Sequence, residues 1–193
     1  RPLIADSVTQ FSNDQGQDGW YHGYRNYTAD GGGDNYDPIS DFIEFEPNHW
    51  RGAQWRLVPG NDPWTSMSAE STHPNGTNSD PNEEHWTVPR WVSEDWNGTR
   101  PVAITWRVRK GGVGGNGVTG SLHINGTMVD SLAVPGNGVT WRGHTYYANL
   151  AKGDIVDLAL SPVGTGNRQD GADGSHNRMV IGDILVENPT QPD

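Results

Sequence analysis

The 193-residue sequence contains no cysteine and few hydrophobic residues. Without cysteine the chain has neither disulfide bonds nor thiolate metal ligands, so its fold depends on packing and backbone hydrogen bonds. No apolar run approaches the roughly 20 residues of a membrane-spanning helix, and we expect no membrane insertion. Hydrophobic residues make up only 32 %, but nine Trp and six Tyr argue against disorder and predict an aromatic core.

Positive charge is also scarce. The chain carries 13 Lys and Arg against 24 Asp and Glu, which gives a formal net charge of −11. Binding to a phosphate backbone or an anionic membrane requires clustered cations, and only Arg107, Arg109 and Lys110 come near a cluster. The composition therefore predicts no nucleic acid partner.

The sequence lacks an apolar stripe with helical spacing, and 26 Gly and 13 Pro interrupt it too often for long helices. Strand-like alternation is present instead, as in residues 102–109, where Val102, Ile104, Trp106 and Val108 share one face. The pair Asn125-Gly126 is typical of a two-residue hairpin turn. Further strands are expected at residues 41–46, 54–58, 64–69, 84–92, 139–148, 154–160 and 179–187.

These short strands predict an all-β fold, a two-sheet antiparallel β-sandwich of jelly-roll-like form. The length suits a single domain over residues 1–193. Residues 1–11 are expected to be extended and to pair either with their own sheet or with the sheet of a neighbouring copy. Four apolar residues would make the contact between copies: Leu3, Ile4, Val8 and Phe11.

Two segments resemble a known group of proteins. They are QGQDGWYHGY at residues 15–24 and HPNGTNSDPNEEHWTVPRWVSEDWNGT at residues 73–99. Together they resemble lectin-like, carbohydrate-binding-module-like β-sandwich modules of bacterial secreted and surface proteins. The resemblance implies a jelly-roll-like sandwich that binds or assembles outside the cell, and it does not imply catalysis.

Aromatic side chains can bind sugars, because the C–H groups of a pyranose pack on ring faces. Trp20 is expected to fasten the first strands into the core, since large rings dominate burial. Four further Trp residues lie within strand patterns and are expected in the core: Trp86, Trp91, Trp106 and Trp141. Three lie near predicted loops and are the candidate carbohydrate contacts: Trp50, Trp64 and Trp96.

Four N-x-Thr sequons lie in predicted loops or turns and are candidate glycosylation sites: Asn26, Asn75, Asn97 and Asn125. Three of them are Asn-Gly-Thr, and Asn-Gly is itself a favoured turn sequence. Glycosylation and turn formation therefore both explain the pattern.

Two acidic glycine-rich loops, DGGGDNYDP and DGADG, are candidate sites for a structural Ca²⁺. Calcium prefers several converging oxygen ligands, although neither loop has the spacing of a recognised calcium loop, and solvated turns explain them equally well. The candidate ligands are Asp30, Asp34, Asp37, Asp170 and Asp173. We expect no other cofactor, because no P-loop, dinucleotide-binding motif or paired histidines are present.

Catalysis has one candidate pair. Glu44 and Glu46 share a strand face about 6.6 Å apart, a separation that glycosidase carboxylates use. The same pair also makes an ordinary polar strand face, and no fuller catalytic motif accompanies it, so we expect no enzymatic activity.

Two non-catalytic functions remain. The first is a secreted structural subunit that associates with copies of itself into a surface fibre or matrix and carries glycans. The second is a carbohydrate-binding module with polysaccharide as its partner. We expect the first, because the chain shows no second domain that a targeting module would serve. Because the chain begins without an initiator Met, we expect a processed, exported protein.

Overall fold

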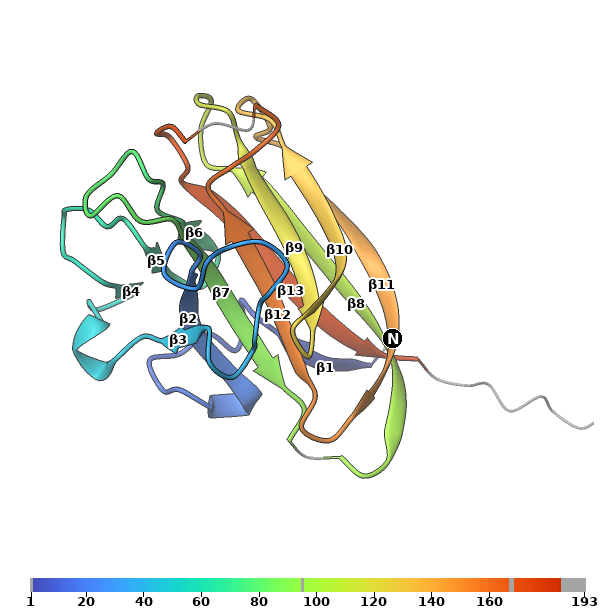
Figure 1. Cartoon of the computed structure of the whole chain (residues 1–193). Helices are drawn as coiled ribbons and strands as arrows, with labels where there is room; N and C mark the ends of the chain where they lie inside the picture. The colour runs from blue at the N-terminus through green and yellow to red at the C-terminus, as the bar shows by residue number, and fades with distance from the viewer. Residues whose placement is uncertain (1, 95, 167–168, 185–193) are drawn as a thin grey trace, which may run out of the picture.

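A computed structural model describes residues 2–94, 96–166 and 169–184, which form two antiparallel sheets packed face to face (Figure 1). This arrangement confirms the predicted all-β sandwich. Sheet A contains β1 (Leu3–Asp6), β4 (Trp55–Arg56), β5 (Ser66–Met67), β6 (Ser71–His73), β8 (Thr99–Lys110), β11 (Arg142–Ala151) and β13 (Ser175–Asp183). Sheet B contains β2 (Trp20–Asn26), β3 (Phe42–Glu44), β7 (His85–Val92), β9 (Val118–Ile124), β10 (Thr127–Val134) and β12 (Ile155–Ser161).

The order of the strands gives the sandwich its jelly-roll-like form. Sheet A runs β11-β8-β13-β6-β5-β4, with β1 also pairing with β13, and sheet B runs β10-β9-β12-β7-β2-β3. From β7 onward the chain passes repeatedly between the sheets, so that neighbours within a sheet, apart from the consecutive β9 and β10, are distant in sequence. Two short 3₁₀ turns, Gln17–Gly19 and Pro47–His49, are the helical elements of the described residues. Neither has the length or the apolar character of a membrane-spanning helix.

The strands with the strongest alternation lie where the sequence places them. Residues 102–109 fall inside β8, and Asn125-Gly126 forms the turn between β9 and β10 with positive φ angles of 50° and 83°. The sequence predicted the short strands β5 and β6 less well. Residues 64–69 contain a strand of only two residues, β5, and the strand β6 was missed. The predicted strand 179–187 begins earlier, at Ser175, and its residues 185–187 lie outside the described residues.

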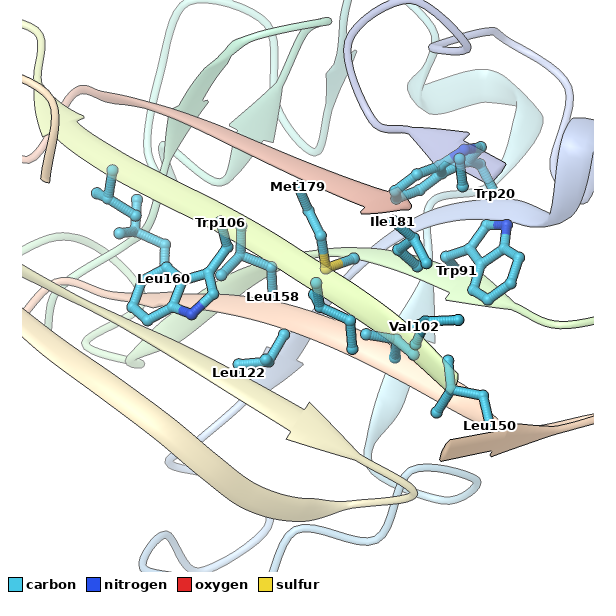
Figure 2. Packing of buried hydrophobic residues seen from close by; sticks show 14 of the residues in the cluster. Trp20, Trp91, Val102, Trp106, Leu122, Leu150, Leu158, Leu160, Met179 and Ile181 are labelled. Carbon is cyan, nitrogen blue, oxygen red and sulfur yellow. The ribbon is translucent and has the colours of Figure 1, made fainter. Parts of the chain in front are cut away.

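The main core lies between the two sheets and is built from the alternating faces of their long strands (Figure 2). Trp106 is fully buried in this core, and its indole N–H donates a hydrogen bond to Asp130 at 2.9 Å. Gly120 lies in β9 opposite this ring, where an added Cβ would approach the Trp106 ring to 2.8 Å. Trp20 and Trp91 are also buried in this cluster, as predicted.

A second aromatic cluster lies beneath the loops around β3, β4 and β5, where Phe45, Trp55 and Met67 are buried. His22 lies between the two rings of Phe11 and Trp55, with centroid distances of 4.9 and 6.1 Å. Burial lowers the pKa of His22 to about 4, because its imidazole is removed from water without a partner for its Nδ1 among the described residues. The folded chain therefore holds this ring neutral.

Replacing Trp106 with alanine should lower the free energy of unfolding by about 3–5 kcal/mol, because the large cavity forms where both sheets converge. Urea denaturation followed by circular dichroism measures the change. Met128→Ala is the control, since this exposed side chain should cost less than about 1 kcal/mol. Equal losses in the two variants would contradict the position of the core.

Stability should fall as the pH is lowered from about 6.5 to 4, because the unfolded chain binds a proton at His22 that the folded chain excludes. The His22→Phe variant should lose about 3 kcal/mol less than the natural chain over this interval. Urea denaturation at pH 7, 5.5 and 4 measures both slopes. Parallel slopes would show that His22 titrates alike in the folded and unfolded chains.

Candidate functional site

The candidate site lies on the outer face of sheet B. This face carries charged and aromatic side chains that are largely covered, whereas the outer face of a sandwich is usually exposed to solvent. The register pairs Arg25 of β2 with Trp86 of β7, and Asp157 of β12 with both Arg90 of β7 and His123 of β9. Paired residues share a face, so these side chains point away from the main core. Residues 27–41 then cross this face as a long loop in front of β12 and β9 (Figure 1).

A buried ion pair ties this loop to the sheet. Arg90 donates to both carboxylate oxygens of Asp157, at 2.7 and 2.8 Å. From the loop, the Tyr36 hydroxyl donates to Asp157 at 2.9 Å and accepts from Arg90 at 3.1 Å. Burial and the neighbouring Asp157 charge raise the pKa of Tyr36 above its usual range, so the hydroxyl keeps its proton. The Arg90 guanidinium also stacks 3.8 Å above the ring centre of Phe42.

Arg25 organises the aromatic part of the face. Its guanidinium binds Asp30 of the loop through Nε at 2.6 Å and Nη2 at 3.1 Å. The same guanidinium carbon lies 4.8, 5.2 and 5.1 Å from the ring centres of Tyr27, Tyr36 and Trp86, respectively. The Tyr27 and Trp86 rings stack on each other, 4.8 Å apart and inclined by 10°. One cation from β2 thus contacts three rings, one from β7 and two from the loop.

Two pockets lie on either side of this aromatic cluster and together with it form what we call the sheet B site. The first pocket has a volume of about 510 Å³ and the second about 460 Å³. The first is lined by Arg25, Gly33, Asp34, Tyr36, His123, Asn125, Gly126, Thr127 and Met128. The second is lined by Tyr27, Glu84, Trp86, Thr119, Ser161, Val163, Gly164 and Gln169.

His123 lines the first pocket as a buried imidazole. The residue is only 3 % exposed, and its Nε2 lies 3.0 Å from the Ser121 hydroxyl. Burial lowers the pKa of the imidazole, which is therefore neutral at neutral pH. Asp34 and Thr127 add an exposed carboxylate and a hydroxyl at the pocket wall.

In the second pocket the polar groups are held in place around the rings. Glu84 accepts from the Trp86 indole at 2.8 Å and from the Gln169 amide at 3.0 Å. The Ser161 hydroxyl lies 3.5 Å from the same carboxylate. The pocket therefore combines two half-buried rings with fixed hydrogen-bonding groups, a combination suited to a polar ligand that also has apolar faces.

The three predicted carbohydrate contacts lie apart from this site and from one another. Trp96 is only 8 % exposed and packs against Trp91 in the main core, which corrects its prediction as an exposed contact. Trp50 packs against Phe11 and belongs to the second cluster. Trp64 is half-buried beneath the guanidinium of Arg56, 5.5 Å from its ring centre.

Two of the Trp residues predicted for the core lie outside it, so that prediction was wrong for them. Trp86 and Trp141 are half-buried on the outer faces of sheets B and A. The sequence around each ring alternates as a strand does, but we predicted that the rings face the core, and they lie on the outer faces. A ring on an outer face is stabilised by a cation, which is Arg25 for Trp86 and Arg107 for Trp141.

The predicted sequons differ in their accessibility. Asn75 is fully buried, and its amide donates to the carbonyls of Gly76 and Glu83, so the folded chain has no room for a glycan there. Asn26 is half-buried and donates to the Glu83 carboxylate at 2.8 Å. Asn97 and Asn125 are exposed and remain the accessible candidates.

The five predicted calcium ligands do not converge. Within the described residues, no group of three or more His, Cys, Asp or Glu side chains is arranged to hold a metal ion. Asp30 is bound by Arg25, Asp37 caps the backbone N–H of Ile39 at 2.8 Å, and Asp34 lines the first pocket alone. Asp170 lies beside Asn116 and Asp173 is buried near Lys110.

The remaining predicted residues lie away from the site. Leu3 and Ile4 belong to β1, which pairs antiparallel with β13 of its own sheet, and Phe11 packs into the second cluster. Val8 follows β1, and its backbone N–H is bound by the Asp6 carboxylate at 3.0 Å. Glu44 ends β3 and Glu46 caps the 3₁₀ turn at Pro47–His49; both are exposed.

Sequence reasoning missed the charged network, although one signal was present. Asp157 lies within the run IVDLAL, where apolar residues surround a single carboxylate. A charge inside an otherwise buried strand requires a paired cation. The partners Arg90 and Tyr36 are 67 and 121 residues away in the chain, so one sequence could not identify them.

Replacing Asp157 with asparagine should lower the free energy of unfolding by about 3–5 kcal/mol, because Arg90 stays buried without a counter-charge. Urea denaturation measures the loss. The double variant Arg90→Met, Asp157→Leu should be less destabilised than the sum of its single changes, since it leaves no buried charge. Additive effects would contradict a coupled pair.

Comparison with known proteins yields similarity in fold only. No protein-family model matches the chain, and no curated protein matches it. Among solved structures, a family 35 carbohydrate-binding module from Clostridium thermocellum is 20 % identical, with a TM-score of 0.34 over 51 % of this chain and 72 % of that chain. The C-terminal family 6 carbohydrate-binding module of a marine laminarinase from Zobellia galactanivorans is 15 % identical, with a TM-score of 0.32 over 57 % and 89 %. A β-glucosidase from Kluyveromyces marxianus is 11 % identical, with a TM-score of 0.39 over 95 % of this chain and 19 % of that chain. The chain is thus structurally similar to carbohydrate-binding modules at low sequence identity.

Proposed function

We propose that the protein binds a carbohydrate at the sheet B site without cleaving it. The observation that carries this proposal is the stacked Tyr27–Trp86 pair, held by Arg25 between two pockets with polar walls. Rings fixed in this way offer apolar contact to sugar C–H groups, and the surrounding side chains offer partners to sugar hydroxyls. The site supports this proposal without any argument from the fold similarity.

The size of the site suits a short oligosaccharide. Pockets that bind small molecules usually enclose about 300–1,000 Å³, and the two pockets have volumes of about 510 and 460 Å³. The cluster of Arg25, Tyr27, Tyr36 and Trp86 contributes to both. A ligand of several sugar units could occupy one pocket, cross the aromatic rings and extend into the other.

Binding without cleavage is supported by the distribution of carboxylates. Glycoside cleavage normally requires two carboxyl groups facing each other across the bond. Each pocket is lined by one carboxylate: Asp34 in the first and Glu84 in the second. Glu84 is already engaged by Trp86 and Gln169, which suits a role in positioning.

This proposal replaces self-assembly into a fibre as the leading function. The segment expected to join neighbouring copies, β1, is paired within its own sheet. Secretion remains part of the proposal, because most polysaccharides that such a site would meet lie outside the cell.

Wild-type protein should bind at least one neutral oligosaccharide in a broad glycan screen, with affinity measured by isothermal titration calorimetry. Trp86→Ala should weaken that binding about tenfold or more, because an aromatic contact contributes about 1 kcal/mol beyond its area. Tyr27→Ala should have a similar effect, since it removes the stacked partner.

Trp64→Ala is the matched control, because this half-buried ring lies outside the sheet B site. It should leave the affinity unchanged, and circular dichroism verifies that all variants fold. Failure of the folded wild type to bind any neutral glycan, or dependence on Trp64 instead of Trp86, would overturn the proposal.

A further inference from the structure

The outer face of sheet A gathers positive charge in a chain whose net charge is −11. In the register of β8 and β13, Arg107 lies directly opposite Arg178, and Arg109 lies directly opposite His176. These side chains alternate with the core residues Val108 and Met179, so they point outward. Like charges directly opposite each other destabilise a sheet. The pairing of Arg107 with Arg178 therefore carries a cost in stability.

The acidic side chains nearby neutralise the face only in part. Asp6 of β1 pairs with Arg178. Glu70 lies 3.9 Å from Arg109 and 3.7 Å from His176, beyond hydrogen-bond distance. Among the described residues, the Arg107 guanidinium therefore lacks an acidic partner, and that of Arg109 has only the more distant Glu70.

Trp141 holds these two guanidinium groups in place. It lies just before β11, and its ring centre is 4.2 Å from the guanidinium carbon of Arg107 and 5.0 Å from that of Arg109. Contact with an indole orients a guanidinium while its N–H groups remain available to an anion. The two donors are thus positioned before any ligand arrives, which lowers the entropy cost of binding.

Space for a ligand exists on both sides of these cations. One pocket of about 330 Å³ is lined by Thr105, Arg107, Arg178 and Val180. A second, of about 350 Å³, lies at the other end beside His176 and the glycine-rich loop at residues 111–112. On the next rung, the exposed hydroxyls of Thr105 and Thr145 lie 3.0 Å apart. The outer face of sheet A therefore carries guanidinium groups, hydroxyl groups and two pockets.

We propose that the outer face of sheet A is a second binding surface, and that its ligand is an anionic polysaccharide. Carboxylate or sulfate groups of the polymer bind the guanidinium groups of Arg107 and Arg109, and its hydroxyls meet Thr105 and Thr145. An extended polymer suits a face with a pocket at each side of the cations better than a compact ligand does. Another copy of this chain suits it less, because the copies repel each other through their net charge.

This surface is separate from the sheet B site in position and in chemistry. It lies on the opposite sheet and depends on charge attraction to the ligand, whereas the sheet B site depends on stacked rings and on hydrogen bonds to uncharged sugar hydroxyls. The failure of either proposal therefore leaves the other intact.

Binding is tested with alginate and dextran sulfate as probes, by affinity electrophoresis and calorimetry from 50 to 500 mM NaCl. The natural chain should bind at least one of them, and the affinity should fall as salt screens the charges. The double variant Arg107→Gln, Arg109→Gln should bind about tenfold more weakly or worse. Arg51→Gln is the single-charge control, because this exposed residue lies outside both pockets of sheet A, and it should leave binding unchanged.

A second variant distinguishes specific binding by the two guanidinium groups from general attraction between opposite charges. Arg107→Lys, Arg109→Lys keeps the charge but loses the planar donors that stack on Trp141, so it should also weaken binding. Full affinity in this variant would overturn the assignment of the two guanidinium groups. No binding of either polymer by the folded wild type would overturn the proposal, as would equal or tighter binding of poly-glutamate, which would indicate an acidic protein segment. Loss of polyanion binding should leave neutral oligosaccharide binding at the sheet B site unchanged.

Discussion

The buried pair of Arg90 and Asp157 determines how the outer face of sheet B is built. Both residues lie on strands, and both charges are removed from water on the side away from the main core. Such a pair is stable only if its remaining hydrogen-bonding groups are satisfied, and the Tyr36 hydroxyl supplies the missing contacts. Tyr36 belongs to the loop 27–41, so the loop must lie across the sheet. Its position brings Tyr27 onto Trp86 and places Asp30 against Arg25.

Arg25 and Arg90 on the outer face of sheet B differ in their partners from Arg107 and Arg109 on the outer face of sheet A. On sheet B, Arg25 and Arg90 are buried, each paired with a carboxylate at about hydrogen-bond distance, and each also contacts an aromatic ring. On sheet A, Arg107 and Arg109 contact a ring but lack a close carboxylate. A satisfied cation fixes structure, whereas an unsatisfied one is available to a ligand. The same pairing of arginine with an aromatic ring therefore positions a loop on sheet B, and in our proposal it serves recognition on sheet A.

The sequence was sufficient for the fold and insufficient for the sites. Alternation in β8 and the Asn125-Gly126 turn depend on local chemistry, and both lie where predicted. The sites depend on contacts between distant segments, such as Tyr36 with Asp157, which one sequence does not reveal. Trp86 and Trp141 show the limit most clearly. Period-2 alternation places residues on two faces without stating which face is buried, and a nearby arginine stabilises a ring on the outer face.

The low hydrophobic content of the chain also has a structural explanation. Hydrophobic residues make up 32 % of the sequence, and the main core between the sheets is built from them. Covering the outer face of sheet B with a second apolar layer would stabilise the fold at least as well as a buried ion pair does. It would, however, place no constraint on where the loop 27–41 lies, because apolar contacts are not directional. Hydrogen bonds between Arg90, Asp157 and Tyr36 are directional, so they select one loop position, and with it one arrangement of the rings that form the sheet B site.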